Sequence, residues 1–295
     1  MKAKLLLFFF CLSVLGGIGQ VPITRNKCKT CGKVISQCPH KGKHPKPVPK
    51  PKPKTTPRVT ASYQNLTVRV GNVKFVMVKV SGGTFTMGAT SEMKDSFDDE
   101  KPTHQVTLSS YYIGETEVTQ ALWKAVMGSN PSHFKGDNRP VERVSWNDCQ
   151  TFISKLNALT GKNFRLPTEA EWEFAARGGN QSRHTQFSGS SRINDVAWYG
   201  GNSGDKTHPV KTKRPNELGI YDMTGNVREW CQDWYGSYSS YAQTNPTGAG
   251  NGSDRVCRGG CWYNSPRGCP SSDRIHHPPG DYTDDDFGLR LALSQ

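Results

Sequence analysis

The positive charge of this 295-residue chain is concentrated at one end. Residues 1–60 hold 13 of the 38 Lys and Arg residues and no Asp or Glu, so the rest of the chain carries 25 basic and 25 acidic side chains. The sequence therefore divides into a basic arm and a neutral part, and a folded domain is expected in the neutral part. A protein that reads nucleic acid is expected to carry its basic patch on the folded domain, so this division argues against nucleic acid as a partner.

The first 19 residues have the pattern of a secretory signal peptide. Lys2 and Lys4 precede a largely apolar run over residues 5–15, which is too short to span a bilayer, and Gly17 and Gly19 supply small residues for cleavage. We expect a secreted, periplasmic or cell-envelope protein, with a retained anchor as the alternative. No later segment is apolar enough for a transmembrane helix, so none is expected once the signal is removed.

Residues 20–44 form a cysteine-bearing basic arm, and residues 45–61 form a linker rich in Pro and Lys. Alternating Pro and Lys favour an extended polyproline II conformation, roughly 40 Å long at about 3.1 Å per residue. The arm suits an anionic envelope surface of lipid or polysaccharide, and a solvated tail is the alternative. Potential zinc ligands of the arm are Cys28, Cys31, Cys38 and His40. A local disulfide is the alternative in an oxidising compartment.

Residues 62–295 are expected to form one domain with three short helices near its start. Thr119, Ser145 and Thr168 are helix-capping residue types that precede helical patterns. The helices are predicted over residues 119–127, 145–159 and 168–177. Strand-like stretches flank a hairpin-type turn at residues 71–72, and the later part of the chain is mostly short strands and polar loops. These features predict an α+β fold, a single compact loop-rich domain with few regular elements.

Five cysteines fall in this domain: Cys149, Cys231, Cys257, Cys261 and Cys269. Export would permit disulfides between them. Because five is an odd number, at least one thiol is free, pairs outside the domain or takes part in chemistry.

Two further groups near the end of the chain have metal-ligand side chains. His276 and His277 are adjacent, and on an extended chain adjacent side chains point to opposite faces, so they are not expected to chelate one ion together. The acidic residues are Asp281, Asp284, Asp285 and Asp286. We expect this acidic run to be a solvated loop, with a cation site as the alternative.

Eight short segments between about residues 73 and 293 form a recognisable pattern. They are 82–88 (GGTFTMG), 104–106 (HQV), 117–119 (EVT), 140–146 (PVERVSW), 165–173 (RLPTEAEWE), 219–230 (GIYDMTGNVREW), 258–260 (RGG) and 288–290 (GLR). In this order they resemble the formylglycine-generating-enzyme family, also called sulfatase-modifying factors. Segments 165–173 and 219–230 are the most specific. The resemblance implies a compact fold of few regular elements that is distantly C-type-lectin-like.

Residues 222–229 have the composition of a calcium-binding turn. Asp222 and Glu229 supply carboxylate oxygens on either side of Gly225, and calcium prefers oxygen ligands. The alternative is a capped turn in which Glu229 forms a salt bridge. The family resemblance implies a structural calcium ion here, bound by the side chains of Asp222 and Glu229 and by the carbonyls of Gly225 and Val227.

The resemblance also implies where catalysis would occur. Active members of the family bind Cu(I) through two cysteines, and the positions of these cysteines fall on Asn264 and Cys269. A carboxamide cannot replace a thiolate as a ligand of Cu(I). Two further departures are Arg228, where the family has Trp, and Cys261, where it has Ser. A displaced pair of Cys261 and Cys269 is one alternative, and a structural disulfide or simple burial of these thiols is the other.

We therefore expect a divergent family member, a pseudoenzyme that binds a peptide or glycan in the groove where active members perform catalysis. Trp262, Tyr263 and Tyr282 are expected to be exposed aromatic side chains in polar loops, and they would suit either ligand. Residues 263–286, rich in Asn, Asp, Ser, Tyr and His, also fit the variable loops that related folds display. The alternative is an active copper- and oxygen-dependent oxidoreductase that converts a cysteine of a sulfatase precursor to formylglycine.

Overall fold

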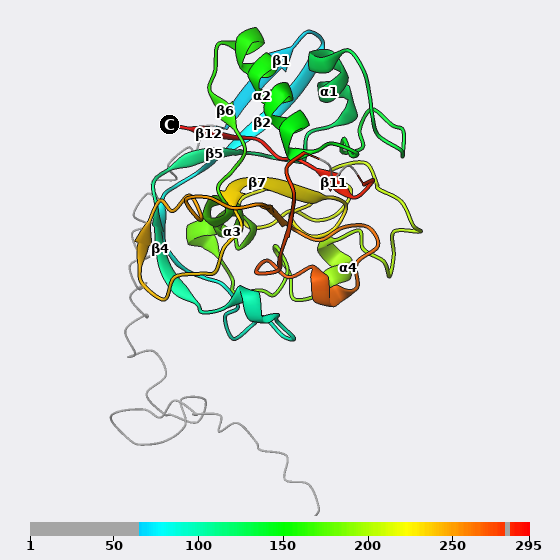
Figure 1. Cartoon of the computed structure of the whole chain (residues 1–295). Coiled ribbons are helices and arrows are strands. Elements are labelled where there is room, and N and C mark those ends of the chain that lie inside the picture. The colour runs from blue at the N-terminus through cyan, green and yellow to red at the C-terminus, as the bar shows by residue number, and fades with distance from the viewer. Residues whose placement is uncertain (1–64, 281–283) are drawn as a thin grey trace, which may run out of the picture. The chain divides into compact units, whose positions relative to one another are not determined.

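Strands from distant parts of the sequence pair into three sheets in the computed structural model, which describes residues 65–280 and 284–295. The strand orders are β1-β2-β5-β12-β6, β10-β9-β7-β11 and β3-β4-β8. The strands are β1 (Leu66–Val70), β2 (Val73–Val80), β3 (Gly83–Met87), β4 (His104–Leu108), β5 (Tyr111–Gly114), β6 (Phe164–Arg165), β7 (Arg228–Trp234), β8 (Gln243–Thr244), β9 (Arg255–Arg258), β10 (Arg274–His277), β11 (Phe287–Gly288) and β12 (Ala292–Ser294). Because β12 pairs with both β5 and β6, the last residues of the chain complete the first sheet (Figure 1).

The described part of the chain also holds four α-helices and three 3₁₀ turns. They are α1 (Gln120–Met127), α2 (Trp146–Thr160), α3 (Glu169–Ala176), α4 (Ile193–Val196), η2 (Asp98–Glu100), η3 (Gly179–Gln181) and η4 (Pro266–Gly268). The three predicted caps are confirmed. The hydroxyls of Thr119, Ser145 and Thr168 accept hydrogen bonds of 3.3, 3.1 and 3.2 Å from the backbone amide three residues later.

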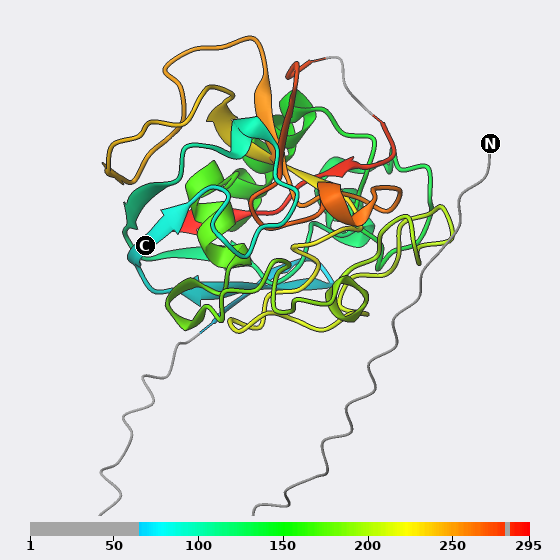
Figure 2. The same cartoon turned by 90° about the horizontal axis from the view of Figure 1, so that it is seen from below.

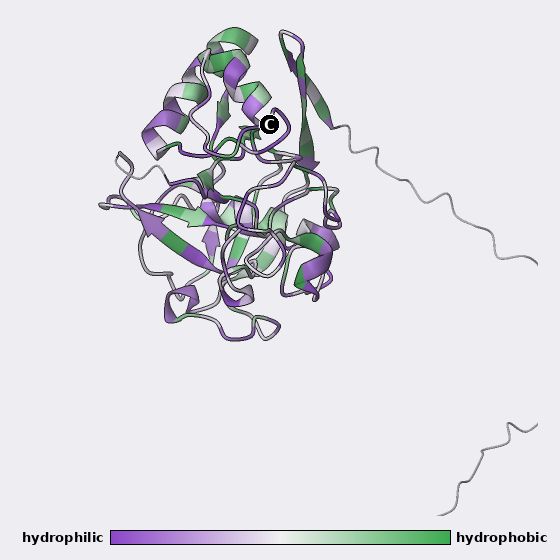
Figure 3. Ribbon diagram, turned by 90° about the vertical axis from the view of Figure 1, so that its right-hand side faces the viewer, coloured by the Kyte–Doolittle hydropathy of each residue, from purple (hydrophilic) through white to green (hydrophobic). Residues whose placement is uncertain are grey.

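One apolar core lies against the five-stranded sheet and helices α1 and α2. Trp123 of α1 stacks on Phe152 of α2 with ring centroids 4.8 Å apart, and both side chains are buried. The helices and strands carry hydrophobic and hydrophilic residues side by side, as amphipathic elements do (Figure 3). Leu159, in the last turn of α2, is 61% exposed. The end of this helix therefore extends beyond the core.

Helix α3 is surrounded by other segments in two perpendicular views (Figures 1 and 2), and all eight of its residues are buried. Three of these residues are glutamates, and buried carboxylates are costly unless they are paired. The pairs are Glu169 with Arg274, Glu171 with Arg165, and Glu173 with Arg177 and Arg258. The RLPTEAEWE segment thus lies at the centre of the fold, and each of its three buried glutamates is paired with an arginine.

Arg290 is fully buried and joins three parts of the structure. Its guanidinium pairs with Glu229 of β7 and donates hydrogen bonds of 2.8 Å to the carbonyls of Gly114, in β5, and Tyr221. The indole of Trp172 in α3 donates to the same Glu229 carboxylate at 2.6 Å. A single side chain therefore ties the first sheet, the second sheet and the loop before β7 together.

The structure confirms the predicted α+β fold, and the described residues belong to one compact unit. Within the described residues, no helix is long and apolar enough to cross a membrane. Several sequence predictions lie outside these residues. They are the signal at 1–19, the arm at 20–44 with Cys28, Cys31, Cys38 and His40, the linker at 45–61, and Tyr282.

Replacing Arg290 by Met should lower the free energy of unfolding by about 3–5 kcal/mol, because it leaves the buried Glu229 without its counter-charge. Leu159→Ser is the control, since a substitution at a largely exposed position should stay within about 0.5 kcal/mol. Urea denaturation followed by tryptophan fluorescence measures both. A loss of only about 1 kcal/mol for Arg290→Met, as for a surface ion pair, would contradict the role given to this residue.

Candidate functional site

Arg228 is the first residue of strand β7, and its guanidinium contacts the other residues of the candidate site. Nη1 donates to Oδ2 of Asp286, to the hydroxyl of Tyr263 at 3.0 Å and to Sγ of Cys261 at 3.2 Å. The backbone amide of Arg228 also donates to the carbonyl of Asp286 at 2.7 Å, beside the parallel pairing of β7 with β11 (Figure 1). Both backbone and side chain therefore hold Arg228 against the thiol of Cys261.

Asn264 closes a tight turn against the other side of Cys261. Its Oδ1 accepts hydrogen bonds from the Cys261 amide at 2.9 Å and from the Cys261 thiol at 3.3 Å. Its own amide donates to the Cys261 carbonyl at 3.1 Å, and its carbonyl accepts from Gly200 at 2.9 Å. The carboxamide thus shapes the loop, and the Cys261 thiol lies between a guanidinium donor and an amide acceptor.

Cys269 brings a second thiol close to Cys261. Its Sγ donates to the carbonyl of Ser265 at 3.5 Å, and its side chain packs with Phe187. A Cβ added to Gly260 would lie 2.8 Å from this sulfur, so the backbone beside Cys261 passes very near it. Burial raises the pKa of both thiols, and the neighbouring Cys261 raises that of Cys269 further. Both are therefore protonated at neutral pH.

The five cysteines of the described residues are all buried free thiols. Of the two structural alternatives for Cys261 and Cys269, burial is the one found, and no disulfide forms between described residues. Cysteines of this kind behave as small apolar side chains rather than as reactive nucleophiles.

The contacts of the site do not fit a Cu(I) centre. Cu(I) selects soft thiolate ligands, and Asn264 offers only a carboxamide at the position where the family resemblance implies the first copper ligand. Cys261 lies 3.2 Å from the Arg228 guanidinium, whose positive charge opposes a metal cation at that sulfur. With Cys261 in contact with Arg228, Cys269 is the one remaining thiol of this site.

The aromatic residues of the site differ in accessibility. Tyr263 is 47% exposed although its hydroxyl donates to Asp286 at 3.0 Å. Trp262 is half-buried, because its indole donates to the carbonyl of Asp285 and its ring meets the edge of Phe134 at 5.4 Å between centroids. The exposed aromatic surface predicted here is therefore confirmed at Tyr263 and smaller than predicted at Trp262.

The prediction of a solvated acidic run is wrong for Asp286. This residue is buried because Arg228 and Tyr263 both donate to its Oδ2. Its other oxygen, Oδ1, has no hydrogen-bond partner among the described residues. The burial of Asp286 could not be predicted from the sequence, because this residue ends a run of acidic residues of the kind expected in a solvated loop.

The adjacent histidines point to opposite sides, as predicted. His276 is half-exposed, stacks on Tyr235 with ring centroids 3.8 Å apart and contacts Asp254 at 2.6 Å. The His277 ring instead meets Phe287 edge-on at 5.1 Å. The two imidazoles therefore cannot ligate one ion together.

The turn over residues 222–229 brings Asp222 and Glu229 near a third carboxylate, Glu117, which sequence analysis missed. Glu117 accepts hydrogen bonds from the Asn226 side chain at 2.8 Å and from the Val227 amide at 3.2 Å. Burial, followed by the charges of Asp222 and Glu229, raises the pKa of Glu117 well above its usual value. Burial likewise raises the pKa of Asp222 to about 6. Three carboxyl groups thus share this buried place, and the raised pKa values mean that without a cation they tend to keep their protons.

A calcium ion at this turn stays a prediction. Among the described residues, no group of three or more His, Cys, Asp and Glu is arranged to hold a metal. The oxygens of Glu229 accept from Arg290 and Trp172, as in the salt-bridged alternative. The three buried carboxyl groups nevertheless suit a cation, and Asp222 with the carbonyls of Gly225 and Val227 would supply hard oxygen ligands.

Without calcium, the contribution of Asp222 to stability should fall as pH rises from about 4 to about 6. The pKa of Asp222 is about 6 in the folded protein against an ordinary 3.8, so the folded state holds this proton more tightly than the unfolded chain. This contribution is present below the ordinary pKa and is lost as pH rises through the folded value. Asp222→Asn should flatten the dependence and raise the Tm at neutral pH in chelator. An unchanged pH profile would contradict this account.

Calcium should raise the Tm of the wild-type protein, because an ion that binds only the folded turn stabilises the folded state. Asp222→Ala should abolish the increase, whereas Asp222→Asn keeps an oxygen ligand and should retain part of it. Differential scanning calorimetry with calcium and with chelator measures the effect. Equal Tm values for the wild type in both conditions would exclude calcium at this turn.

Comparisons with a family model and with individual proteins point to the same family. The chain matches the sulfatase-modifying factor enzyme 1-like domain over residues 69–295. It is 38% identical over 239 residues to the chaperone protein LppX of Paenibacillus barcinonensis, covering 64% of this chain and 79% of that protein. It is also 38% identical over 254 residues to the formylglycine-generating enzyme of Thermomonospora curvata, covering 62% of this chain and 81% of that protein.

Among solved structures, Treponema denticola variable protein 1 superposes with a TM-score of 0.72 at 36% sequence identity, covering 78% of this chain and 99% of that chain. The family match covers residues 69–295, which include the eight short segments identified in the sequence and nearly all the helices and strands of the domain. The chain therefore belongs to the sulfatase-modifying factor family, whose domain is that of the formylglycine-generating enzymes.

Proposed function

We propose that this protein is a non-catalytic member of its family that binds a peptide or glycan ligand. The observation that carries the proposal is the contact of the Arg228 guanidinium with Cys261 Sγ at 3.2 Å. Arg228 is fixed there by Asp286, and Asn264 stands where the family has the first copper ligand. Family membership alone leaves the activity open, because the relatives include a protein named as a chaperone as well as enzymes.

The ligand surface that we propose is the exposed side of residues 262–280 and 284–286. The exposed side chains of these described residues are Tyr263, Ser265, Pro266, Arg267, His276, Pro278 and Asp284. An aromatic ring surrounded by hydroxyl, guanidinium, imidazole and carboxylate groups can stack on a ligand and also fix its orientation through hydrogen bonds. This mixture supports a polar ligand such as a peptide or glycan.

The backbone beneath this surface is fixed by buried side chains. Arg258 donates to the carbonyls of Ser271, Ser272 and Asp273 at 2.9, 2.7 and 2.7 Å. The Ser272 hydroxyl in turn donates to Glu100 at 2.6 Å. Because these contacts do not involve the exposed side chains, those side chains can differ without loss of the fold. One similar solved structure is of a protein named a variable protein, which is in keeping with exposed side chains that can differ on this fold.

A second candidate is a copper-dependent oxidoreductase that converts a cysteine of a sulfatase precursor to formylglycine. The proximity of Cys261 and Cys269 favours it, because two thiols lie beside the same stretch of backbone at Gly260. This candidate requires Arg228 to leave Cys261 and both thiols to lose their protons.

We also propose that the protein acts outside the cytoplasm. Residues 1–19 have the pattern of a signal peptide, and the basic residues of the following arm suit an anionic envelope surface. Zinc at Cys28, Cys31, Cys38 and His40 belongs to the same proposal and has a local disulfide as its alternative.

A variant in which Cys28, Cys31 and Cys38 are replaced by Ser, so that the arm has no thiols, should not bind Cu(I) in a competition titration with a chromogenic chelator. The Arg228 guanidinium opposes a cation at Cys261, and Cys269 alone supplies only one thiol. Asn264→Cys combined with Arg228→Trp should bind Cu(I), since it restores the second thiol and removes the opposing charge. Asn264→Ser with Arg228→Trp is the matched control without a thiol. Stoichiometric Cu(I) binding by the variant without arm thiols, lost when Cys261→Ser is added, would contradict this prediction and favour the second candidate.

A further inference from the structure

Strand β3 lies at the edge of its sheet. The strand order is β3-β4-β8, so β4 pairs with one side of β3, and no strand among the described residues pairs with the other side. An unpaired strand edge presents N–H and C=O groups that can pair with another extended chain. Which groups of β3 face this free edge follows from its pairing with β4.

The backbone groups of Thr84 and Thr86 point to the free edge. The carbonyl of Thr107, opposite Thr84, accepts a hydrogen bond of 2.9 Å from Asn245, which follows β8. Thr107 thus directs its backbone groups to β8, so Thr84 and Thr107 form a pair without backbone hydrogen bonds between them. Their hydroxyls approach to 2.8 Å, as the closer side chains of such a pair allow. Because this direction alternates along a strand, Thr86 is oriented like Thr84.

Neighbouring side chains bind the backbone beyond both ends of this edge but not in its middle. Beyond one end, the amide nitrogen of Asn180 donates to the carbonyl of Gly82 at 2.9 Å. Beyond the other end, Gly88 donates to Glu173 at 2.9 Å and accepts from Arg177 at 2.6 Å. Between these contacts, the outward N–H and C=O groups of the two threonines have no hydrogen-bond partner among the described residues.

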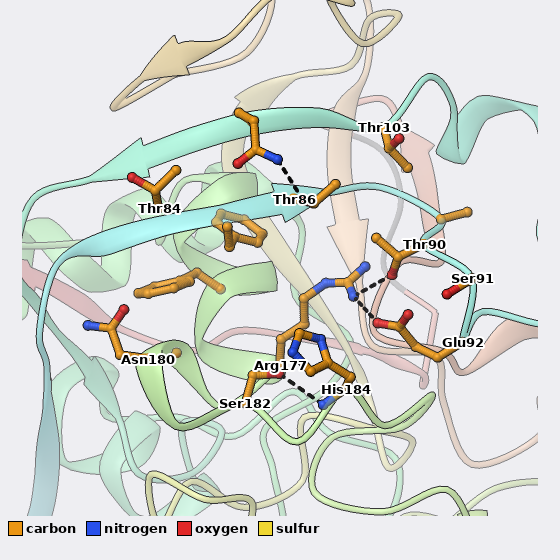
Figure 4. Close-up of a pocket in the computed structure, with 15 residues that line it drawn as sticks. Thr84, Thr86, Thr90, Ser91, Glu92, Thr103, Arg177, Asn180, Ser182 and His184 are labelled. Atoms are coloured by element: carbon orange, nitrogen blue, oxygen red, sulfur yellow. Dashed lines mark hydrogen bonds and ion pairs between the residues drawn. The ribbon is translucent and has the colours of Figure 1, made fainter.

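A groove of about 740 Å³ runs along this edge. It is lined by Thr84 and Thr86 and also by Phe85 between them, all exposed or half-buried. Successive side chains of a strand point to opposite faces, so the groove borders the edge of β3 rather than one face alone. Figure 4 shows Thr84 and Thr86 on one side of the groove and Asn180 and Ser182 on the other. The volume lies within the range of about 300–1,000 Å³ that is usual for ligand sites.

The groove carries little unbalanced charge. Arg177, which lines it, donates to Thr90 and Glu92 at 3.0 Å each, as the dashed lines of Figure 4 show, and it also pairs with Glu173. Its positive charge is thus compensated within the protein, and its side chain is only 8% exposed. An uncharged ligand therefore suits the groove better than an acidic or a basic one.

Phe85 gives the groove an apolar wall. Its half-buried ring packs on Phe174, with ring centroids 5.1 Å apart. A peptide strand beside β3 would direct alternate side chains toward this ring and toward the opposite face, where Thr84 and Thr86 carry their hydroxyls. Apolar and hydroxyl-bearing residues in alternation, such as Val and Thr, therefore suit the two faces.

We propose that this groove binds an uncharged extended peptide, which adds a strand to the free edge of β3 through the N–H and C=O groups of Thr84 and Thr86. Two donors and two acceptors recur there at an interval of two residues, a pattern that matches a peptide backbone. The five residues of β3, about 17 Å at about 3.4 Å per residue, suit a peptide of about the same length.

This site is separate from the one assigned above. The groove shares no lining residue with the Arg228 site or with the proposed ligand surface around Tyr263. Its failure would therefore leave the proposed function standing.

The test is a titration of the ¹⁵N-labelled full chain with acetyl-Thr-Val-Thr-Val-Thr-amide. The amide resonances of Thr84, Thr86 and Asn180 should shift and saturate. The same peptide with all of its residues N-methylated should not saturate these shifts, because it keeps the side chains but lacks the backbone donors.

Thr86→Pro and Thr86→Val form a matched pair of variants. Proline removes the outward N–H of residue 86 and leaves the hydrogen bonds between β3 and β4 in place, as edge strands tolerate. It should weaken binding by about three- to tenfold, the change expected for one hydrogen bond. Valine removes only the hydroxyl, so Thr86→Val should bind the peptide as the wild type does. Tm measurements show whether both variants remain folded, and the N-methylated peptide tests the wild type if Thr86→Pro does not fold.

Equal binding of the N-methylated peptide, equal binding by a folded Thr86→Pro variant, or an absence of shifts at Thr84 and Thr86 would overturn the proposal. Shifts confined to Tyr263 and its neighbours would overturn it too, because the peptide would then bind the other surface. So would a dimer in sedimentation equilibrium that Thr86→Pro dissociates, because the free edge would then hold a second copy of the chain.

Discussion

Buried arginine–carboxylate pairs hold this fold together, and the pair of Arg290 with Glu229 is the one on which most of it depends. The regular elements are short, so many loop carbonyls have no partner in a helix or sheet. A guanidinium offers several donors in one plane and can satisfy a carboxylate and carbonyls at once. Arg290 does so between β5, β7 and Tyr221, and Arg258 does so for the loop at residues 271–273. The loops are therefore ordered by side chains rather than by secondary structure.

This framework explains how the candidate site can depart from the family's copper chemistry while the fold persists. Successive side chains of a strand point to opposite sides, so Glu229 of β7 faces Arg290 while Arg228 faces Cys261. A change at residue 228 therefore alters the site without removing the central ion pair. Asn264 also belongs to the site without taking part in the central ion pair. Its carboxamide accepts a hydrogen bond from the Cys261 amide and so supports the loop. Arg228 and Asn264, which we propose to oppose copper binding, are thus also part of the ordered structure around Cys261.

The features that could be predicted from the sequence are mostly local. The caps at Thr119, Ser145 and Thr168 act within three residues, so their pattern is visible in one short segment. Glu117 and Asp286 could not be predicted, because their partners lie 109 and 58 residues away in the chain. The resemblance to the family located Asn264 and Cys269, but the hydrogen bonds that surround Cys261 follow only from the fold.

The central claim is that the Arg228–Cys261–Asn264 arrangement carries no oxidase chemistry. Mass spectrometry of a peptide with the motif C-x-P-x-R, incubated with the purified protein, Cu(I) and oxygen, tests this most directly. An active formylglycine-generating enzyme serves as the positive control. The account predicts that the peptide cysteine stays unchanged while the control converts it. Repeated turnover of the peptide to formylglycine by the unmodified protein would contradict the account.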